Sequence, residues 1–264
     1  MESKTVLVPE GISGPAFSGV RYFCTRRQLV QDEQHATDAL NLGLNTPDEP
    51  AQVYANRERL YLQANLPNQP LWLTQVHGAE VLDADQQDLG SEAQRRVDAA
   101  VTTRPDRVLA ILTADCLPVI MWNEAGTIIA AAHAGWRGLA AGVLENTWAV
   151  MQNKRVNCTR FHAWIGPAIS QDCFEVGQEV YEEFVNAEQA LTRFFKPGAI
   201  SGKWYADLSG IAEFKLKQLS LGSMQVHQSR ACTYSEASHY YSYRRSALTG
   251  RQASVAYLTK ESSK

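Results

Sequence analysis

Short apolar runs alternate with polar segments along the whole chain, and their length indicates which element each forms. Runs of about four to eight residues rich in Val, Ile, Leu and Ala are typical of buried strands. Such runs predict strands at residues 5–8, 19–24, 71–76, 108–113, 117–122, 127–132, 161–165, 224–227 and 254–258.

Longer segments between these runs have a helical pattern. Asp48 followed by Pro50 indicates an N-cap with proline in the first turn of a helix over residues 48–64. The remaining helices are expected at residues 139–152, 178–189 and 208–219.

The spacing of the expected strands indicates how they pair. Strands 108–113, 117–122 and 127–132 lie too close together for helical crossovers, so this part is expected to be antiparallel. The polar segments 83–96 and 196–203 are too short to be domain linkers. We therefore expect one domain over residues 1–264, of mixed α/β or α+β class with partly antiparallel sheets.

The composition limits the kinds of partner that this protein can bind. Lys and Arg number 25 against 28 Asp and Glu, a net charge of −3, so no basic field is available for nucleic acid or an anionic membrane. No apolar stretch is long enough to span a bilayer, and the first residues lack the apolar core of a secretory signal. Five scattered cysteines suit reduced thiols, which favours a cytoplasmic protein.

Three metal-capable side chains stand where expected strands end. His77, Cys116 and His133 follow the strands at 71–76, 108–113 and 127–132. They are much farther apart in the sequence than the ligands of structural zinc motifs, which suits a catalytic site with one open position. Two alternatives remain open: Cys116 as a nucleophile activated by a histidine, or three ordinary core residues.

Copper needs separate consideration, because two His and one Cys also form the equatorial set of blue-copper sites. Only six histidines are present in the chain, too few for a site with several copper ions. Copper binding at a zinc site remains plausible, because copper binds nitrogen and sulfur ligands more tightly.

Several residues are candidates for binding an anion. Gly135 and Gly138 flank Arg137 at an expected strand-to-helix turn, where backbone N–H groups and a guanidinium can approach phosphate. Arg57 lies on the apolar stripe of its helix, so it needs an anionic partner, either a ligand or a carboxylate at the rim.

The segment near the C-terminus combines aromatic and basic side chains. They could stack a purine and hold phosphate, or form a solvated ribbon edge. The residues concerned are Tyr234, Tyr240, Tyr241, Tyr243, Arg244, Arg245 and Arg251. The remaining histidines and three cysteines are expected to be structural or on the surface: His35, His162, His227, His239, Cys24, Cys158 and Cys173.

At these residues the sequence resembles the YfiH/YlmD-type family, also called laccase-domain or polyphenol oxidase family proteins and described as purine nucleoside phosphorylases. The motifs that carry the resemblance are CTRR at 24–27, LNLG at 40–43, NR at 56–57, LTQVHG at 73–78, DAAV at 98–101, TADCLP at 113–118, AAHAGWRG at 131–138, GPAISQDCFEVG at 166–177, YSYRR at 241–245 and TGR at 249–251.

The resemblance implies a four-layer α/β fold and a zinc site formed by His77, Cys116 and His133. It also implies phosphorolysis of adenosine, inosine and 5′-methylthioadenosine, with adenosine deamination as a further activity. Asn41 and Arg57 become substrate or phosphate contacts. The partners are then purine nucleosides and phosphate, bound by a monomer or homodimer.

One departure and two alternatives accompany this expectation. The family continues its early Thr-Arg with Gly-Gly-Val-Ser, whereas Arg26 is followed here by Arg27 and residues 28–31, QLVQ, so the glycine pair that lets a ligand approach the backbone is missing. The alternatives are a copper-dependent polyphenol oxidase and a thiol hydrolase or amidase with Cys116 as nucleophile. Asp115 is a candidate acid–base group, a partner to a histidine ligand, or a loop cap.

Overall fold

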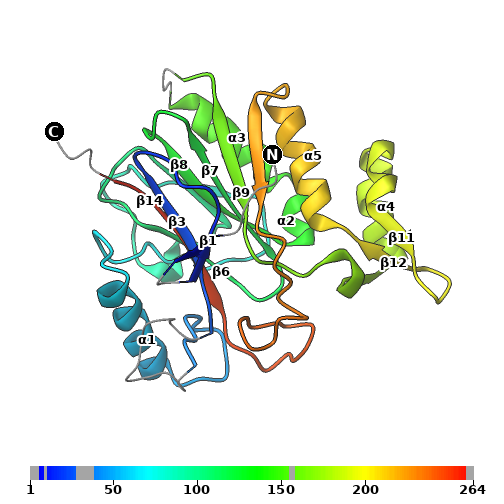
Figure 1. The fold of residues 1–264 in the computed structure, drawn as a ribbon, viewed down its shortest axis with the longest axis horizontal. Coiled ribbons are helices and arrows are strands. Elements are labelled where there is room, and N and C mark those ends of the chain that lie inside the picture. Colours follow the sequence, from blue (N-terminus) through cyan, green and yellow to red (C-terminus); the bar gives the residue numbers. More distant parts are fainter. Residues whose placement is uncertain (1–5, 9–10, 28–38, 155–157, 260–264) are drawn as a thin grey trace.

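A computed structural model describes residues 6–8, 11–27, 39–154 and 158–259 and shows two large β-sheets with helices outside them (Figure 1). One sheet has the order β1-β2-β3-β14-β6, with β1 at Val6–Val8, β2 at Gly11–Ser13, β3 at Val20–Thr25, β14 at Gln252–Leu258 and β6 at Leu109–Thr113. The other has the order β13-β9-β7-β8-β5-β4, with β13 at Met224–Gln228, β9 at Phe161–Ile165, β7 at Leu117–Asn123, β8 at Ile129–Ala134, β5 at Ala99–Thr102 and β4 at Val81–Asp83.

Alternation along β7 shows how the layers are held together. Ile120 and Trp122 pack against residues of the five-stranded sheet, whereas Val119 and Met121 face a second core shared with the helices. Because successive strand residues point to opposite faces, one strand supplies both cores.

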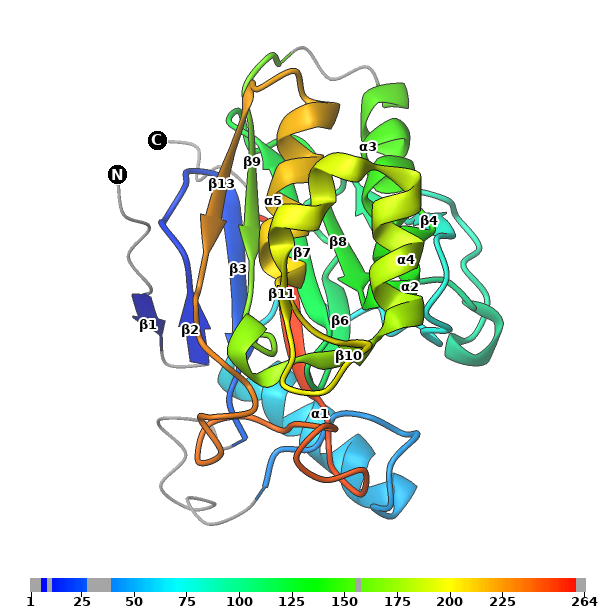
Figure 2. The same cartoon turned by 90° about the vertical axis from the view of Figure 1, so that its right-hand side faces the viewer.

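The helices that cover the six-stranded sheet lie together in Figure 2. They are α2 at Trp136–Ala140, α3 at Val143–Asn153, α4 at Gln178–Ala187 and α5 at Leu208–Leu219. The outer face of the five-stranded sheet packs instead against α1, Pro50–Gln63, through residues such as Leu60. Helix, sheet, sheet and helices therefore form four layers, which confirms the expected mixed α/β fold.

A smaller sheet lies beside α4. It consists of β10 at Glu175–Gly177, β12 at Lys203–Ala206 and β11 at Phe195–Pro197, all antiparallel. Three 3-10 helices, at Glu92–Gln94, Gln171–Cys173 and Gln189–Phe194, complete the regular elements of the described residues. None of the helices described is long and apolar enough to cross a membrane.

The expected strand at 71–76 is wrong. Only Leu71 makes a bridge, to Leu109 on β6. Farther along, the side chain of Gln75 replaces the ladder: its amide donates to the Leu112 carbonyl and its oxygen accepts from the Leu112 N–H, each at 2.7 Å. The side chain of Gln75 thus provides the hydrogen-bond partners of Leu112 at the edge of β6. The backbone of residues 72–76 therefore does not form a strand there.

Other boundaries also differ from the expectation. The expected helix at 139–152 is broken into α2 and α3 at Gly142, whose φ of 92° is left-handed. The N-cap position of α1 is Glu49, which makes no side-chain capping hydrogen bond, and not Asp48, whose carboxylate accepts a hydrogen bond from Asn41. Strands β7 and β8 are antiparallel as expected, but β6 belongs to the other sheet. Helix α5 has the expected bounds.

Candidate metal centre and its cleft

His77, Cys116 and His133 meet at one point of the structure. Their ligand atoms all lie within 4.8 Å of one another, and no other group of three or more such residues occurs in the described part of the chain. The Cys116 Sγ is 4.0 Å from Nε2 of His77, and the two imidazole rings lie 4.7 Å apart at 79°. The three residues expected to bind metal therefore converge.

Different elements deliver the three side chains. His133 lies within β8 and not after it, so its ring position is fixed by a buried strand. Cys116 lies in the tight link between β6 and β7, directly after Asp115, which has a left-handed φ of 98°. His77 is also left-handed, with φ of 60°. Such backbone conformations cost about 1–3 kcal/mol each and persist only where surrounding contacts hold them.

Asp98 provides those contacts around His77. Its fully buried carboxylate accepts hydrogen bonds from the backbone N–H groups of Val76, His77 and Gly78, at 3.1, 2.9 and 2.7 Å. The same carboxylate lies 2.8 Å from Nδ1 of His133. This bond orients the ring and leaves Nε2 of His133 for a metal. The carboxylate partner of a histidine ligand is therefore Asp98, and not Asp115.

Charges at the cluster favour a thiolate–imidazolium pair, and a metal ion that binds there would displace the proton of His133. Burial raises the pKa of Cys116, but the charge and hydrogen bonds of His133, with help from His77, outweigh it and lower that pKa to about 6. Burial lowers the pKa of His133, but Cys116 and Asp98 raise it to about 9. The pKa of Asp98 is lowered: burial opposes this, but hydrogen bonds from His133 and Gly78 prevail.

The donor set fits a zinc ion. Tetrahedral zinc with bonds of about 2.0–2.3 Å holds its ligand atoms roughly 3.5 Å apart, close to the separation of Cys116 and His77. A thiolate is the form of cysteine that binds metal, and the lowered pKa of Cys116 supplies it near neutral pH. All three candidate ligands line the cleft described below, so a bound zinc ion would be accessible to substrate, as in a catalytic site.

Gly135 and Gly138 shape this site by their lack of side chains. A Cβ on Gly135 would lie 2.9 Å from the Cys116 Sγ and 3.2 Å from Cδ2 of His77. A Cβ on Gly138 would lie 2.7 Å from the carbonyl oxygen of Gly78, so α2 packs directly on the His77 segment. Neither glycine is among the residues that line the cleft, whereas Arg137 is.

Asp115 ties the metal segment to the C-terminal loop. Its buried carboxylate accepts hydrogen bonds from the hydroxyls of Thr233 and Ser242, at 2.7 and 3.0 Å, and from the Arg244 N–H at 2.7 Å. Three donors occupy its two oxygens, which holds the left-handed residue in place. The loop-cap interpretation of Asp115 describes these contacts.

A cleft of about 1060 Å³ opens beside the three metal-capable residues. It is lined by aromatic side chains from α1, α2 and two loops: Tyr54, Trp136, Phe174 and Tyr243. Four arginines also line it, Arg96, Arg137, Arg244 and Arg251, together with the carboxylate of Glu92. Flat apolar faces and positive charges thus surround one wall that carries the candidate metal ligands.

Arg57 and Asn41 lie behind the wall of this cleft. The buried guanidinium of Arg57 grips Glu92 with two bonds of 2.7 and 3.1 Å, donates to the Leu42 carbonyl and lies 4.2 Å from the Trp72 ring centroid. The side-chain oxygen of Asn41 accepts from the Arg251 N–H at 2.8 Å. Each therefore supports a residue that lines the cleft and does not line it itself.

The aromatic and basic residues near the C-terminus divide into two groups. Tyr243, Arg244 and Arg251 line the cleft, whereas Tyr240 and Tyr241 are buried in the structure. Arg245 donates to the carbonyls of Thr233, Tyr234 and Tyr240 and so holds the loop together. The unusual segment after Arg27, together with His35, lies outside the described residues.

Two features were missed by the sequence analysis. Asp98 lies in the DAAV motif, but its role depends on backbone groups of residues 76–78, which no local pattern reveals. Glu92 lines the cleft in a polar segment that the sequence analysis considered only as a loop. An inward-facing Arg57 was the only signal for Glu92, because it required an anionic partner.

Comparisons with known proteins agree with this architecture. The chain is 44% identical over 222 residues to "Purine nucleoside phosphorylase YfiH" of Escherichia coli strain K12, covering 84% of this chain and 87% of that protein. It is 42% identical over 244 residues to "Purine nucleoside phosphorylase PA4543" of Pseudomonas aeruginosa, covering 92% and 96%.

Solved structures are similar over nearly the whole chain. The Neisseria meningitidis protein NMB0706 has a TM-score of 0.81 and 38% identity, covering 98% of this chain and 100% of that one. YlmD from Geobacillus stearothermophilus has a TM-score of 0.77 and 25% identity, covering 93% and 94%. Residues 20–259 match the family described as "Multi-copper polyphenol oxidoreductase laccase". The chain therefore belongs to this laccase-domain family, which includes the YfiH and YlmD proteins.

Proposed function

We propose that this protein is a zinc-dependent purine nucleoside phosphorylase that acts on adenosine, inosine and 5′-methylthioadenosine. The observation that carries the proposal is the cleft in which His77, Cys116 and His133 face aromatic and arginine side chains. The names of the relatives at 44% and 42% identity support the same reaction class. An aromatic wall suits a purine, and arginines suit phosphate.

The metal is proposed to be zinc, held by His77, Cys116 and His133. Bound zinc supplies a Lewis acid and a fixed positive charge at this end of the cleft. Asp98 fixes the ring of His133 and the backbone of His77, so the ligands are positioned before the metal arrives. All five cysteines are free thiols in the structure, which supports the proposed cytoplasmic setting.

The remaining residues bind and orient the two substrates. Exposed Tyr54 and Tyr243 offer faces for a purine at the cleft. Arg137 is exposed, lies 4.3 Å from the Trp136 ring centroid and is proposed to contact phosphate at the rim. Arg57 acts as a positioning residue through Glu92, and Asn41 does so through Arg251. In phosphorolysis phosphate attacks the ribose carbon as the purine leaves, so correct placement lowers the barrier.

The decisive experiment compares nucleoside turnover with and without phosphate. Zinc-loaded protein should release free base and ribose 1-phosphate from adenosine and inosine only when phosphate is present. The variants His77→Ala, Cys116→Ala and His133→Ala should each lose stoichiometric zinc together with activity. Base release that does not depend on phosphate would replace phosphorolysis by hydrolysis.

Adenosine deamination is proposed as an additional reaction of the same cleft. Its volume of about 1060 Å³ is at the upper end of the range of about 300–1,000 Å³ usual for ligand pockets, which leaves water beside a bound nucleoside. Incubation of adenosine without phosphate should then yield inosine and ammonia. Release of ammonia should be lost in Cys116→Ala, and its persistence there would assign deamination to a contaminating enzyme.

A thiol hydrolase is the second candidate, and one geometric feature favours it. Cys116, His133 and Asp98 follow the order nucleophile, base and carboxylate, with His133 Nδ1 2.8 Å from Asp98. His77 Nε2 at 4.0 Å from the sulfur adds a third ligand that such a triad does not need. Metal-free protein that turns over an ester or amide and is covalently trapped at Cys116 would favour the hydrolase.

A copper-dependent polyphenol oxidase is the third candidate function, and it is suggested by the description of the family. Outside the candidate centre, the histidines that the structure describes are engaged elsewhere. His162 and His227 pack against each other, and His239 lies 3.6 Å from Glu236. The chain thus lacks a second imidazole cluster in its described part. Oxidation of phenols with a defined copper content tests this activity, and we expect it to be slow.

A further inference from the structure

Arg251 is held in one place at the wall of the cleft, immediately before β14. Its backbone N–H donates to the side chain of Asn41 at 2.8 Å, and its carbonyl accepts from the Leu42 N–H at 3.1 Å. Its Nη1 donates to the carbonyls of Thr249 and Gly250, each at 2.9 Å. Its stem also packs on Gly43, where a Cβ would lie 2.6 Å from Cγ of Arg251. The guanidinium is therefore positioned in advance.

Among the described residues, the charge of this guanidinium has no direct partner. No carboxylate of these residues lies within ion-pair distance of Arg251, and its guanidinium hydrogen bonds are the two from Nη1. Burial lowers its pKa, although Cys116, Tyr243 and Asp115 oppose this through their charges. Asp115 is already occupied by three other donors. A half-buried cation with free donors at a cleft gains most from a bound anion.

Three other arginines near the cleft show the contrast. The guanidinium of Arg57 donates two hydrogen bonds to Glu92. That of Arg245 donates its hydrogen bonds to the carbonyls of Thr233, Tyr234 and Tyr240. Neither lines the cleft. Arg244 lines it but donates Nη1 to the Glu175 carbonyl and is exposed. Arg251 alone among these four combines partial burial, a fixed backbone and free donors at the cleft.

We propose that Arg251 anchors an oxyanion subsite that binds inorganic phosphate in the cleft. The inference rests on the proposed function and adds the residue that holds the second substrate. It also separates the roles of two arginines, because exposed Arg137 contacts the anion at the rim whereas Arg251 holds it from the wall. The side chain of Asn41 then acts on phosphate through the backbone of Arg251.

The test measures phosphate binding and turnover separately on the zinc-loaded full chain. Titration of inorganic phosphate followed by ³¹P NMR gives its Kd without catalysis, and initial rates give KM for phosphate and for inosine. Arg251→Gln should raise Kd and KM for phosphate by about 10- to 100-fold, the loss of a charged hydrogen-bonding partner. KM for inosine should change less than about threefold, because the purine does not use this group.

Three further variants make the outcome specific. Arg251→Lys keeps the charge, so its phosphate Kd should lie between wild type and Gln; a Lys variant no better than a folded Gln variant would instead indicate collapse of the 249–251 turn and overturn the proposal. Arg160→Gln removes the same charge outside the cleft, beside Glu124, and should leave phosphate Kd unchanged. Arg137→Gln should raise it less than Arg251→Gln. An Arg137→Gln effect larger than that of Arg251→Gln would also overturn it.

The proposal and the proposed function fail in different ways. If wild-type protein binds phosphate through Arg251 but does not cleave nucleosides, the proposed subsite stands and the proposed phosphorylase activity is overturned. If the protein catalyses phosphorolysis and Arg251→Gln leaves the KM for phosphate unchanged, the phosphorylase activity stands and the proposed subsite is overturned. A parallel titration with adenosine 5′-monophosphate distinguishes a site for inorganic phosphate from a site for the phosphate group of a nucleotide. Binding of that nucleotide without competition from inorganic phosphate would overturn an inorganic phosphate site.

Discussion

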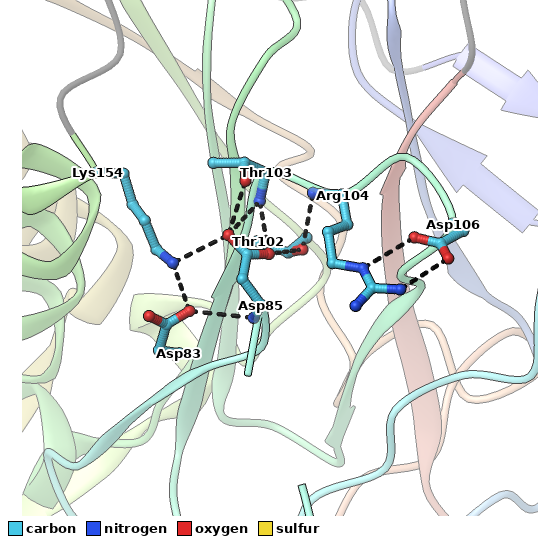
Figure 3. Close-up of polar contacts among 7 residues, drawn as sticks. All are labelled: Asp83, Asp85, Thr102, Thr103, Arg104, Asp106 and Lys154. Atoms are coloured by element: carbon cyan, nitrogen blue, oxygen red, sulfur yellow. Dashed lines mark hydrogen bonds and ion pairs between the residues drawn. The ribbon is translucent and has the colours of Figure 1, made fainter. Parts of the chain in front are cut away.

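The two ends of strand β5 each carry a network centred on a carboxylate, and the networks differ in where their positive charge comes from. At one end Asp85 accepts hydrogen bonds from the hydroxyl of Thr102 at 2.6 Å and from the N–H and hydroxyl of Thr103 at 3.0 and 2.7 Å (Figure 3). Lys154 from the end of α3 completes this network, 2.9 Å from Asp85 and also in contact with Asp83.

At the other end Asp98 uses donors of a different kind. Three are backbone N–H groups of residues 76–78, and the fourth is Nδ1 of His133. Among the described residues, no lysine or arginine contacts the Asp98 carboxylate, and its cationic partner there is an imidazole that also reaches the candidate metal position. The Asp85 network is closed and holds β4, β5 and α3 together. The Asp98 network is open toward the candidate metal position, through His133.

Asp98→Asn should have the largest effect of any substitution in these networks, because it disrupts the network at the candidate metal position. The amide replaces one accepting oxygen by a donor that faces backbone N–H groups and His133, so His77 loses its left-handed position and His133 its orientation. Zinc affinity should fall by about 10- to 100-fold, with a parallel loss of phosphorolysis. Competition with a chromophoric chelator measures the affinity independently of turnover.

The matched control is Asp85→Asn, which makes the same chemical change at the other end of β5. It should retain stoichiometric zinc and wild-type turnover, because its partners do not touch the metal ligands. Equal zinc loss in both variants would mean that β5 transmits damage from either end, and the distinction between an open and a closed network would not hold.

Gly135→Ala tests the space available at the open end. The added Cβ would meet the Cys116 sulfur at 2.9 Å and His77 at 3.2 Å, so the ligands must separate. We expect zinc affinity to fall on the order of 10-fold, and the crowding to cost about 1–3 kcal/mol of unfolding free energy. Gly78→Ala, directly after His77, is the control, because its Cβ would meet neighbours only at 3.6 Å. A similar loss in both variants would point to backbone stiffening instead of crowding.

Much of the candidate metal centre could be predicted from the sequence, because its three candidate ligands follow apolar runs that form or border strands. The ligand types and wide spacing indicated a site assembled from separate elements, and the structure brings them within 4.8 Å. The mixed fold and helix α5 were also predictable, since they follow from local periodicity.

The supporting contacts could not be predicted in this way. Asp98 has no local signal, since its partners lie in residues 76–78 and in β8. Gln75 imitates a strand ladder with its side chain, which no periodicity encodes. Arg57 was recognised as inward-facing, but whether its partner was a ligand or Glu92 depended on tertiary packing. Asp115 stands next to a ligand in sequence, yet its side chain is committed to the C-terminal loop.

Asp85→Asn should affect stability where Asp98→Asn affects metal binding. Burial raises the pKa of Asp85, but hydrogen bonds from Thr102, Thr103 and Lys154 outweigh it and lower the pKa to about 2. The unfolded-state value is about 3.9, so the stabilisation is fully present above about pH 4 and is lost as pH falls through 2. Urea unfolding at neutral pH should show a loss of about 1–2 kcal/mol, because the network is partly exposed.

The pH dependence of that loss checks its origin. The difference in unfolding free energy between wild type and Asp85→Asn should shrink as the pH is lowered from about 4 toward 2. Thr103→Val, which removes one hydroxyl donor from the same carboxylate, should show a smaller loss with the same trend. A difference that stays constant over this range would assign the effect to packing.

A histidine stack far from both carboxylates should govern stability at milder acidity. His162 on β9 is only 4% exposed, lies 4.3 Å from the Phe17 ring and stacks with Trp122 and His227 at 5.6 and 6.0 Å. Neither of its ring nitrogens has a hydrogen-bond partner among the described residues. Burial, and then the charge of His227, lower its pKa. Its neutral form is therefore the one that the fold accommodates.

His162→Phe isolates this effect from those of Asp85 and Asp98. Because the folded-state pKa of His162 lies below an unfolded value of about 6.5, stability is present above that pH and falls as the pH drops below it. Phe cannot be protonated, so unfolding free energy between about pH 6.5 and 5 should decline less in the variant, by roughly 1 kcal/mol. Asp85→Asn should leave that slope unchanged, since Asp85 titrates at lower pH. Parallel slopes for wild type and His162→Phe would instead assign the mild-acid loss to His227, whose pKa is also lowered by burial.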